Sequence, residues 1–300
     1  MKPPPFDYHA PRDLGEALAV LAEVGAHGKV LAGGQSLIPL MNMRLAAPEH
    51  LVDINRVAAL DTVDAGRDGV RVGALARHAA VERSEAAVRV QPLLRTALRL
   101  VAHPVIRNRG TVVGSLVHAD PSAELPAVLT LLGGTVRLAR HGGAQRDVAA
   151  GRFFTGPLES ALQPGELAVS AFFPALPPRT GTAFHEVARR HGDYAVAGAA
   201  ALVTLDDDLR IAGARAVFVS AGPVPVLLDL TEVCERRPAA SVDWPAVERA
   251  VRERLDPDAD IHATAEYRRH LSGVLAARAL RTAAAVAAGD PGRSGEERDG

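Results

Sequence analysis

Two glycine-containing segments that lie far apart in the sequence could bind a diphosphate. The first glycine segment is Ala32-Gly33-Gly34-Gln35-Ser36, and Leu37 after it could begin a short helix. Adjacent glycines let the backbone approach a ligand and turn its N–H groups inward, and the amino end of a helix favours negative charge. The Ser36 hydroxyl could add a donor. A glycine pair after a strand is more often a plain turn, so this segment alone decides nothing.

The second glycine segment, residues 111–115, combines the hydroxyls of Thr111 and Ser115 with Gly114. Two such segments could clamp one diphosphate. The carboxylates of Asp120 and Glu124 follow and could accept hydrogen bonds from ribose hydroxyls, although either could instead cap the helix predicted to begin at Pro121. For Asp120 alone, capping is the favoured role.

Other nucleotide-binding and metal-binding patterns are missing from the sequence. Neither glycine segment has the three-glycine spacing of a Rossmann domain, and no Walker lysine is present, so nucleoside triphosphate hydrolysis and ordinary NAD binding lose support. The same observations favour a flavin-binding fold that uses dispersed glycine loops. The histidines do not follow a metal-binding spacing, and no metal is predicted; those weighed are His103, His118, His185 and His191.

Composition narrows the partners and the compartment. Basic and acidic side chains nearly cancel, 34 against 35, which removes the electrostatic argument for nucleic acid or an anionic membrane surface. Cys234 is the only cysteine, so the chain cannot form an internal disulfide or hold a four-cysteine cluster. We find no apolar signal-peptide core near Met1 and no stretch that could span a membrane, and we expect a cytoplasmic protein.

The elements that must position these segments follow from hydrophobic periodicity. A helix capped by Asp13 precedes a strand that leads directly into the first glycine segment. The predicted helices of this part cover residues 13–25, 91–101 and 121–132, and the predicted strands cover residues 29–32, 51–54, 69–75, 135–139 and 166–173.

Clustered prolines at Pro174, Pro177 and Pro178 predict a linker and a domain boundary, because proline continues neither a helix nor a β-ladder. Asp206 to Asp208 form a plausible hairpin turn between antiparallel strands. Beyond the linker we predict strands at residues 183–188, 195–205 and 210–220, helices at residues 243–255 and 264–287, and a disordered polar tail at residues 289–300.

Three separated motifs in register resemble the FAD-binding medium subunits of the xanthine dehydrogenase and carbon monoxide dehydrogenase family, the molybdenum hydroxylases. The resemblance extends from about residue 3 to 286. The motifs are Ala32 to Leu37; Ile106 to Thr111 with Gly114 to Leu116 and His118 to Pro121; and Val187 to Arg190 with Gly192 to Ala195.

The resemblance implies an α+β fold. It implies a two-lobed vanillyl-alcohol-oxidase or PCMH-type FAD-binding domain over residues 1–176, with lobes of about residues 1–56 and 57–176. A small α/β domain of the carbon monoxide dehydrogenase flavoprotein type, with an antiparallel sheet and helices, would follow over residues 181–287.

The same resemblance implies roles for individual residues. The two glycine segments match the pyrophosphate loops, Glu124 matches a carboxylate that holds the adenosine ribose, and Leu167 lies near a position that packs on the flavin. Tyr194 matches an aromatic position beside the isoalloxazine ring, with a core-packed strand tyrosine as an equal alternative. The full set of expected FAD-binding residues is Ala32, Gly33, Gly34, Gln35, Ser36, Leu37, Thr111, Gly114, Ser115, Asp120, Glu124, Leu167 and Tyr194.

Three positions near the motifs carry separate expectations. Val113 stands where the family usually has glycine, so its branched side chain should crowd the phosphate, and mutation to glycine should tighten FAD binding. Glu186 stands where relatives often carry lysine. A carboxylate at this position should disfavour an anionic reduced flavin and so alter the redox potential of the flavin. Arg189 and Arg190 are expected first as solvated or ion-paired surface residues.

The function implied is that of an oxidoreductase subunit. Electrons from iron–sulfur clusters of a partner subunit would pass through FAD to an external acceptor, while a separate large subunit binds molybdopterin. No residue of this chain is expected to act as a general acid or base. Two alternatives remain open, namely a stand-alone FAD-dependent oxidase or tailoring enzyme, and a binding or assembly protein that has lost FAD.

Overall fold

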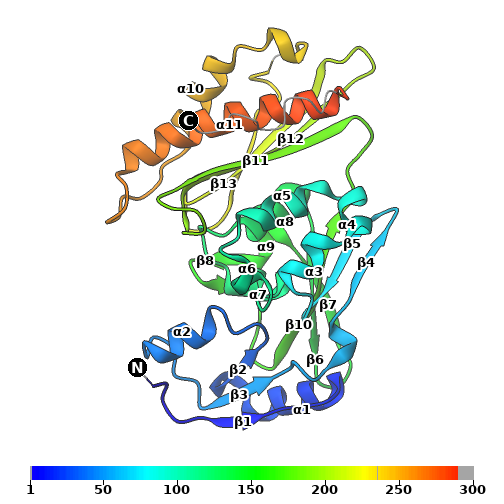
Figure 1. The fold of residues 1–300 in the computed structure, drawn as a ribbon, viewed down its shortest axis with the longest axis vertical. Coiled ribbons are helices and arrows are strands. Elements are labelled where there is room, and N and C mark those ends of the chain that lie inside the picture. Colours follow the sequence, from blue (N-terminus) through cyan, green and yellow to red (C-terminus); the bar gives the residue numbers. More distant parts are fainter. Residues whose placement is uncertain (1, 235, 290–300) are drawn as a thin grey trace.

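Three larger β-sheets follow one another along the described part of the chain, and helices cover their faces (Figure 1). The computed structural model describes residues 2–234 and 236–289, and it has the predicted α+β fold. Residues 290–300 of the predicted disordered tail lie outside the described residues. No helix in the described part of the chain is long and apolar enough to cross a membrane.

The amino-terminal sheet is parallel, and its strands lie in the order β1-β3-β2. Asp13 caps the first helix by accepting a hydrogen bond from the Glu16 N–H, as the sequence predicts. Parallel pairing of β2 and β3 places the residues that follow both strands at one edge of the sheet. The elements are β1 (Asp7–His9), α1 (Leu14–Val24), β2 (Gly28–Leu31), α2 (Leu37–Asn42) and β3 (His50–Asp53).

The middle sheet is antiparallel and has the order β4-β5-β10-β6-β7, so its longest strand, β10, lies at the centre. Its strands are β4 (Val63–Gly66), β5 (Gly69–Gly73), β6 (Thr135–Arg140), β7 (Gln145–Ala149) and β10 (Glu166–Pro174), and β8 (Phe154–Gly156) with β9 (Glu159–Ser160) forms a separate hairpin. Its helices are α3 (His78–Arg83), α4 (Glu85–Val90), α5 (Pro92–Leu100), α6 (Pro104–Arg107), α7 (Val112–His118), α8 (Glu124–Leu132) and α9 (Ala150–Phe153).

The carboxy-terminal sheet is buried on both faces. Phe184 and Val217 belong to a core shared with the middle sheet and its helices, whereas Phe218 belongs to a second core with the two last helices. Burial on both faces explains why the strand at residues 195–205 is almost continuously apolar. The elements, in the sheet order β11-β12-β13-β14, are β11 (Thr180–Ala188), β12 (Ala195–Leu205), β13 (Ile211–Val219) and β14 (Val226–Asp229), with α10 (Trp244–Arg254) and α11 (Ala265–Ala287).

The predicted helices and strands are present in the structure, with two differences near the second glycine segment. That segment is not a loop, because its residues from Val112 onward form the first turn of α7. The helix expected to begin at Pro121 begins instead at Glu124. The linker is also shorter than expected, since Pro174 still belongs to β10 and Thr180 already belongs to β11.

Candidate functional site

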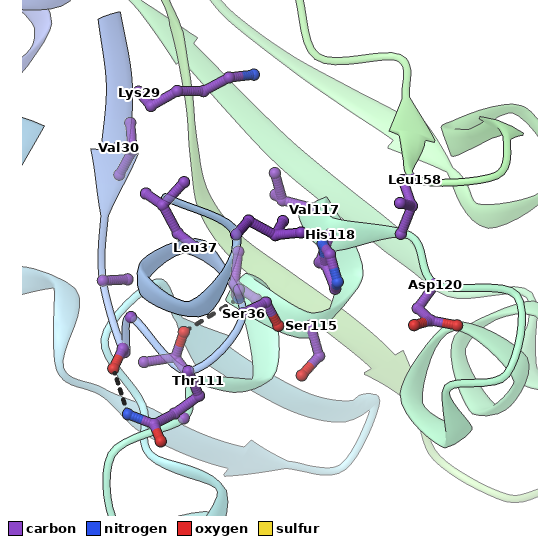
Figure 2. Close-up of a pocket in the computed structure, with 18 of the residues that line it drawn as sticks. Lys29, Val30, Ser36, Leu37, Thr111, Ser115, Val117, His118, Asp120 and Leu158 are labelled. Atoms are coloured by element: carbon purple, nitrogen blue, oxygen red, sulfur yellow. Dashed lines mark hydrogen bonds between the residues drawn. The ribbon is translucent and has the colours of Figure 1, made fainter. Parts of the chain in front are cut away.

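A cavity of about 830 Å³ lies between the amino-terminal sheet, the helices of the middle sheet and the loop after β11. In Figure 2, Ser36 and Leu37 lie beside Thr111 and Ser115, while Lys29 and Asp120 mark opposite ends of the view. All of the residues expected at the site line this cavity: Ala32, Gly33, Gly34, Gln35, Ser36, Leu37, Thr111, Gly114, Ser115, Asp120, Glu124, Leu167 and Tyr194.

The first glycine segment is a tight backbone turn between β2 and α2. Gly34 has a φ of 72°, which few residues other than glycine adopt, and its carbonyl accepts a hydrogen bond from the Ile38 N–H. The backbone N–H groups of Gly34, Gln35 and Ser36 have no acceptor among the described residues. Unpaired backbone donors at residues that line a cavity are suited to binding an anion.

Glycine is needed at position 33 for packing within the protein, whereas the sequence suggests that it lets the backbone approach a ligand. A Cβ atom at this position would lie 2.5 Å from the carbonyl oxygen of Arg109 and 2.8 Å from the Cα of Gly110. Gly33 therefore allows the first glycine segment to pack directly against the residues that precede the second one. The absence of a side chain at Gly33 thus allows close contact between the two parts of the site.

The second glycine segment is the capped start of a helix. The Thr111 hydroxyl accepts a hydrogen bond from the Gly114 N–H at 3.1 Å, and a Cβ atom at Gly114 would lie 2.5 Å from that hydroxyl. Val113 is only 2 % exposed and belongs to the hydrophobic core. Most of its side chain therefore packs against other residues, but Val113 also lines the cavity, and crowding of the phosphate stays a prediction.

Two polar side chains that sequence reasoning missed tie the two segments together. The Asn55 side-chain amide donates to the Ala32 carbonyl at 2.8 Å, and its amide oxygen accepts from Arg77 at 2.6 Å. Arg77 also donates to the carbonyl of Arg109. The sequence signal for this link is weak: Asn55 comes shortly after β3, and β3 pairs with β2, the strand that leads into the first glycine segment.

The carboxyl groups of Asp120 and Glu124 line the cavity, and Glu186 lies near Glu124. Asp120 accepts a hydrogen bond from the Ser122 N–H at 2.8 Å, so it caps the turn before α8 and not the helix itself. Burial, together with the nearby carboxylates of Glu186 and Asp120, raises the pKa of Glu124 to about 8. Burial likewise raises the pKa of Glu186 to about 7. Both carboxyl groups therefore keep their protons to a higher pH than an exposed glutamate, Glu124 more so than Glu186.

The loop between β11 and β12 brings the carboxy-terminal sheet to the cavity. Tyr194 is 69 % exposed, so the alternative of a core-packed strand tyrosine is wrong. Arg189 and Arg190 are exposed and pair with Asp193, at 3.9 and 3.2 Å, which confirms the expected surface role. Gly192 packs against the His103 ring, where a Cβ atom would lie 2.6 Å from the ring.

Comparison with known proteins places the chain in a family. Residues 4–176 match the FAD binding domain in molybdopterin dehydrogenase, and residues 182–283 match the CO dehydrogenase flavoprotein C-terminal domain. The chain is 40 % identical to the 6-hydroxypseudooxynicotine dehydrogenase complex subunit alpha of Paenarthrobacter nicotinovorans, over 93 % of this chain and 95 % of that protein. It is also 40 % identical to the caffeine dehydrogenase subunit beta of Pseudomonas sp. (strain CBB1), over 95 % and 96 % of the two chains.

A solved structure agrees with these sequence matches. A chain of quinoline 2-oxidoreductase from Pseudomonas putida 86 superposes with a TM-score of 0.88 at 33 % identity, covering 96 % of this chain and 99 % of that one. The chain therefore belongs to the family of FAD-binding medium subunits of molybdenum hydroxylases, and FAD is its cofactor. The cavity fits this cofactor, since its volume is within the range of cofactor sites and its walls carry unpaired backbone donors.

Proposed function

We propose that this chain is the subunit through which a molybdenum hydroxylase delivers electrons to an external acceptor. Electrons would arrive from iron–sulfur clusters in a partner subunit, after substrate oxidation at a separate molybdopterin-binding subunit. The observation that carries the proposal is the single cavity that unites both glycine segments. Cys234, the only cysteine, is buried and cannot hold a cluster by itself, so the clusters belong to another chain.

In this proposal the residues of the chain bind and orient the cofactor, which supplies the redox chemistry when bound. The unpaired N–H groups of residues 34–36 and the hydroxyls of Ser36 and Ser115 hold the diphosphate. Glu124 holds the adenosine ribose, and Leu167 and Tyr194 flank the isoalloxazine ring. None of these side chains needs to transfer a proton during turnover.

The division into domains and the cellular location are part of the proposal. A FAD-binding domain at residues 1–176, with lobes of about residues 1–56 and 57–176, would precede a domain at residues 181–287. The family matches at residues 4–176 and 182–283 support this division. The lone cysteine supports a reducing compartment such as the cytoplasm.

Purification of the native complex tests the electron-transfer role. We expect the tagged chain to co-purify with two further subunits, together with iron, molybdenum and one FAD per copy. Reduction of the FAD by the substrate of the complex should then require the iron–sulfur subunit. A flavin-only homo-oligomer that reacts with its own organic substrate would instead support a stand-alone oxidase or tailoring enzyme. A chain that binds no FAD would support an assembly protein.

A further inference from the structure

His78, the first residue of α3, lies directly behind the second glycine segment and has no role in the proposed function. Its side chain is 3 % exposed and contributes to the cavity wall. The Nε2 atom lies 3.0 Å from the Ser115 hydroxyl, whereas Nδ1 has no hydrogen-bond partner among the described residues. The sequence singled out Ser115 as a phosphate ligand but gave no indication of this neighbour.

The position of the His78 ring is fixed by its surroundings. The His78 backbone N–H donates to the Gly110 carbonyl at 2.9 Å, and a Cβ atom at Gly110 would lie 2.9 Å from Nδ1. The ring is thus held between α3 and the residue before the second glycine segment. A buried ring with one partner can control the direction of that partner's hydrogen bond.

The protonation state of the ring determines what Ser115 can do. Burial, together with the cations of Arg107 and Arg77, lowers the pKa of His78 to about 4, although a hydrogen bond with the Thr111 backbone acts in the opposite direction. At neutral pH the imidazole therefore has one N–H donor and one acceptor nitrogen. No acceptor lies in hydrogen-bond geometry around Nδ1, so a proton there would meet at most the weak interaction with the Thr111 backbone. A proton on Nε2 finds the Ser115 oxygen.

We propose that His78 is a positioning residue for the diphosphate of the cofactor. Its Nε2–H donates to the Ser115 oxygen, so the Ser115 hydroxyl cannot donate back to the ring and must point its own hydrogen into the cavity. This inference rests on the proposed role of Ser115 as a phosphate ligand. Because the Ser115 N–H already donates to the Thr111 carbonyl at 3.1 Å, that backbone bond and the His78 bond together fix the serine.

A double-mutant cycle on the flavin-free full-length chain tests the proposal, with FAD and riboflavin as probes. We expect His78→Ala to weaken FAD binding about tenfold, the scale of one charge-assisted hydrogen bond. His78→Gln, whose amide N–H can replace Nε2–H, should bind FAD within about threefold of wild type. In a Ser115→Ala background the His78→Ala effect should disappear. Riboflavin lacks the diphosphate and should bind equally to all four chains.

A matched control distinguishes positioning from general packing. The Nε2 atom of His185 lies 3.3 Å from the Thr282 hydroxyl, a similar pair outside the cavity, so His185→Ala should leave FAD affinity unchanged. Circular dichroism and thermal melting identify any variant that fails to fold, and Ser115→Ala then carries the test. Nitrogen-15 NMR of the wild-type imidazole should show the Nε2–H tautomer.

The possible results distinguish failure of the proposed function from failure of the positioning role of His78. If the wild-type chain binds no FAD, the proposed function fails. If wild type binds FAD but His78→Ala binds it equally well, or weakens riboflavin equally, the positioning role is overturned. The Nδ1–H tautomer would also overturn it, because Ser115 would then donate to the ring and not into the cavity.

Discussion

The two glycine segments look alike in the sequence but are built in different ways. The first is a backbone turn that lines the cavity, its N–H groups at residues 34–36 have no acceptor in the described part of the chain, and Gly33 permits its contact with Arg109. The second is a helix start in which Thr111 caps the Gly114 N–H and His78 holds Ser115. The first segment depends on backbone geometry, whereas the second depends on side chains, and substitutions should affect them differently.

The largest effect is expected at Gly33, where the segments meet. Gly33→Ala would place a Cβ atom against backbone atoms that cannot rotate away, so we expect about 3 kcal/mol of lost stability. FAD affinity should fall by at least about tenfold, because the two segments must move apart. Thermal unfolding and FAD titration measure both quantities. Gly66→Ala, with no atom within 4 Å of the new Cβ, is the control and should behave like wild type.

A smaller effect is expected at Val113, and it differs from what the sequence suggests. Val113→Gly removes a buried side chain and adds glycine to a helix, so unfolding should become easier by about 2 kcal/mol. FAD affinity should change by less than about threefold. Calorimetry and FAD titration test both statements. A tenfold gain in affinity would restore the crowding hypothesis.

Loss of the cap at Thr111 should have a more modest effect. Thr111→Val keeps the shape but removes the acceptor for the Gly114 N–H, which costs about 1 kcal/mol at a helix N-cap. Chemical denaturation of the flavin-free chain measures this loss. Thr130→Val is the control, because the Thr130 hydroxyl only bonds back to the Pro126 carbonyl within α8. Equal losses in the two variants would contradict the capping role.

A separate effect concerns pH and the carboxyl groups of the cavity. A carboxyl whose folded-state pKa is raised contributes stability at low pH that is lost as pH rises through that value. For Glu124 the loss should fall between about pH 4.5 and pH 8. In Glu124→Gln the melting temperature should decline less from pH 6 to pH 9, with Glu186 retaining part of the slope. Parallel wild-type and variant curves would contradict the raised pKa.

Local signals in the sequence predict much of the fold. The predicted cap at Asp13 is confirmed, and the helices predicted at residues 243–255 and 264–287 begin with caps from Asp243 and Thr264, because each cap is an interaction with the next few residues. The helix α7 was not predicted because its three valines and one glycine have low helix propensity, and burial in the core stabilises it instead.

The candidate site shows the same division between local and non-local signals. The glycine segments could be found because glycine and serine types already suggest a ligand. Three other side chains could not be found from the sequence, because only tertiary packing brings each of them to its partner. The pairs are Asn55 with Ala32, Arg77 with Arg109, and His78 with Ser115. The order of the motifs identified the family, whereas the parts of each segment that perform the binding required the structure.

Ligand-dependent stability tests the central claim most directly, namely that the two segments hold the FAD diphosphate. Melting of the flavin-free chain should be compared with FAD, with riboflavin and with neither. We predict that FAD at about 100 times its Kd raises stability by about 2.7 kcal/mol, and that riboflavin at the same concentration gives a much smaller rise. Equal stabilisation by both ligands, or none by FAD, would contradict the account.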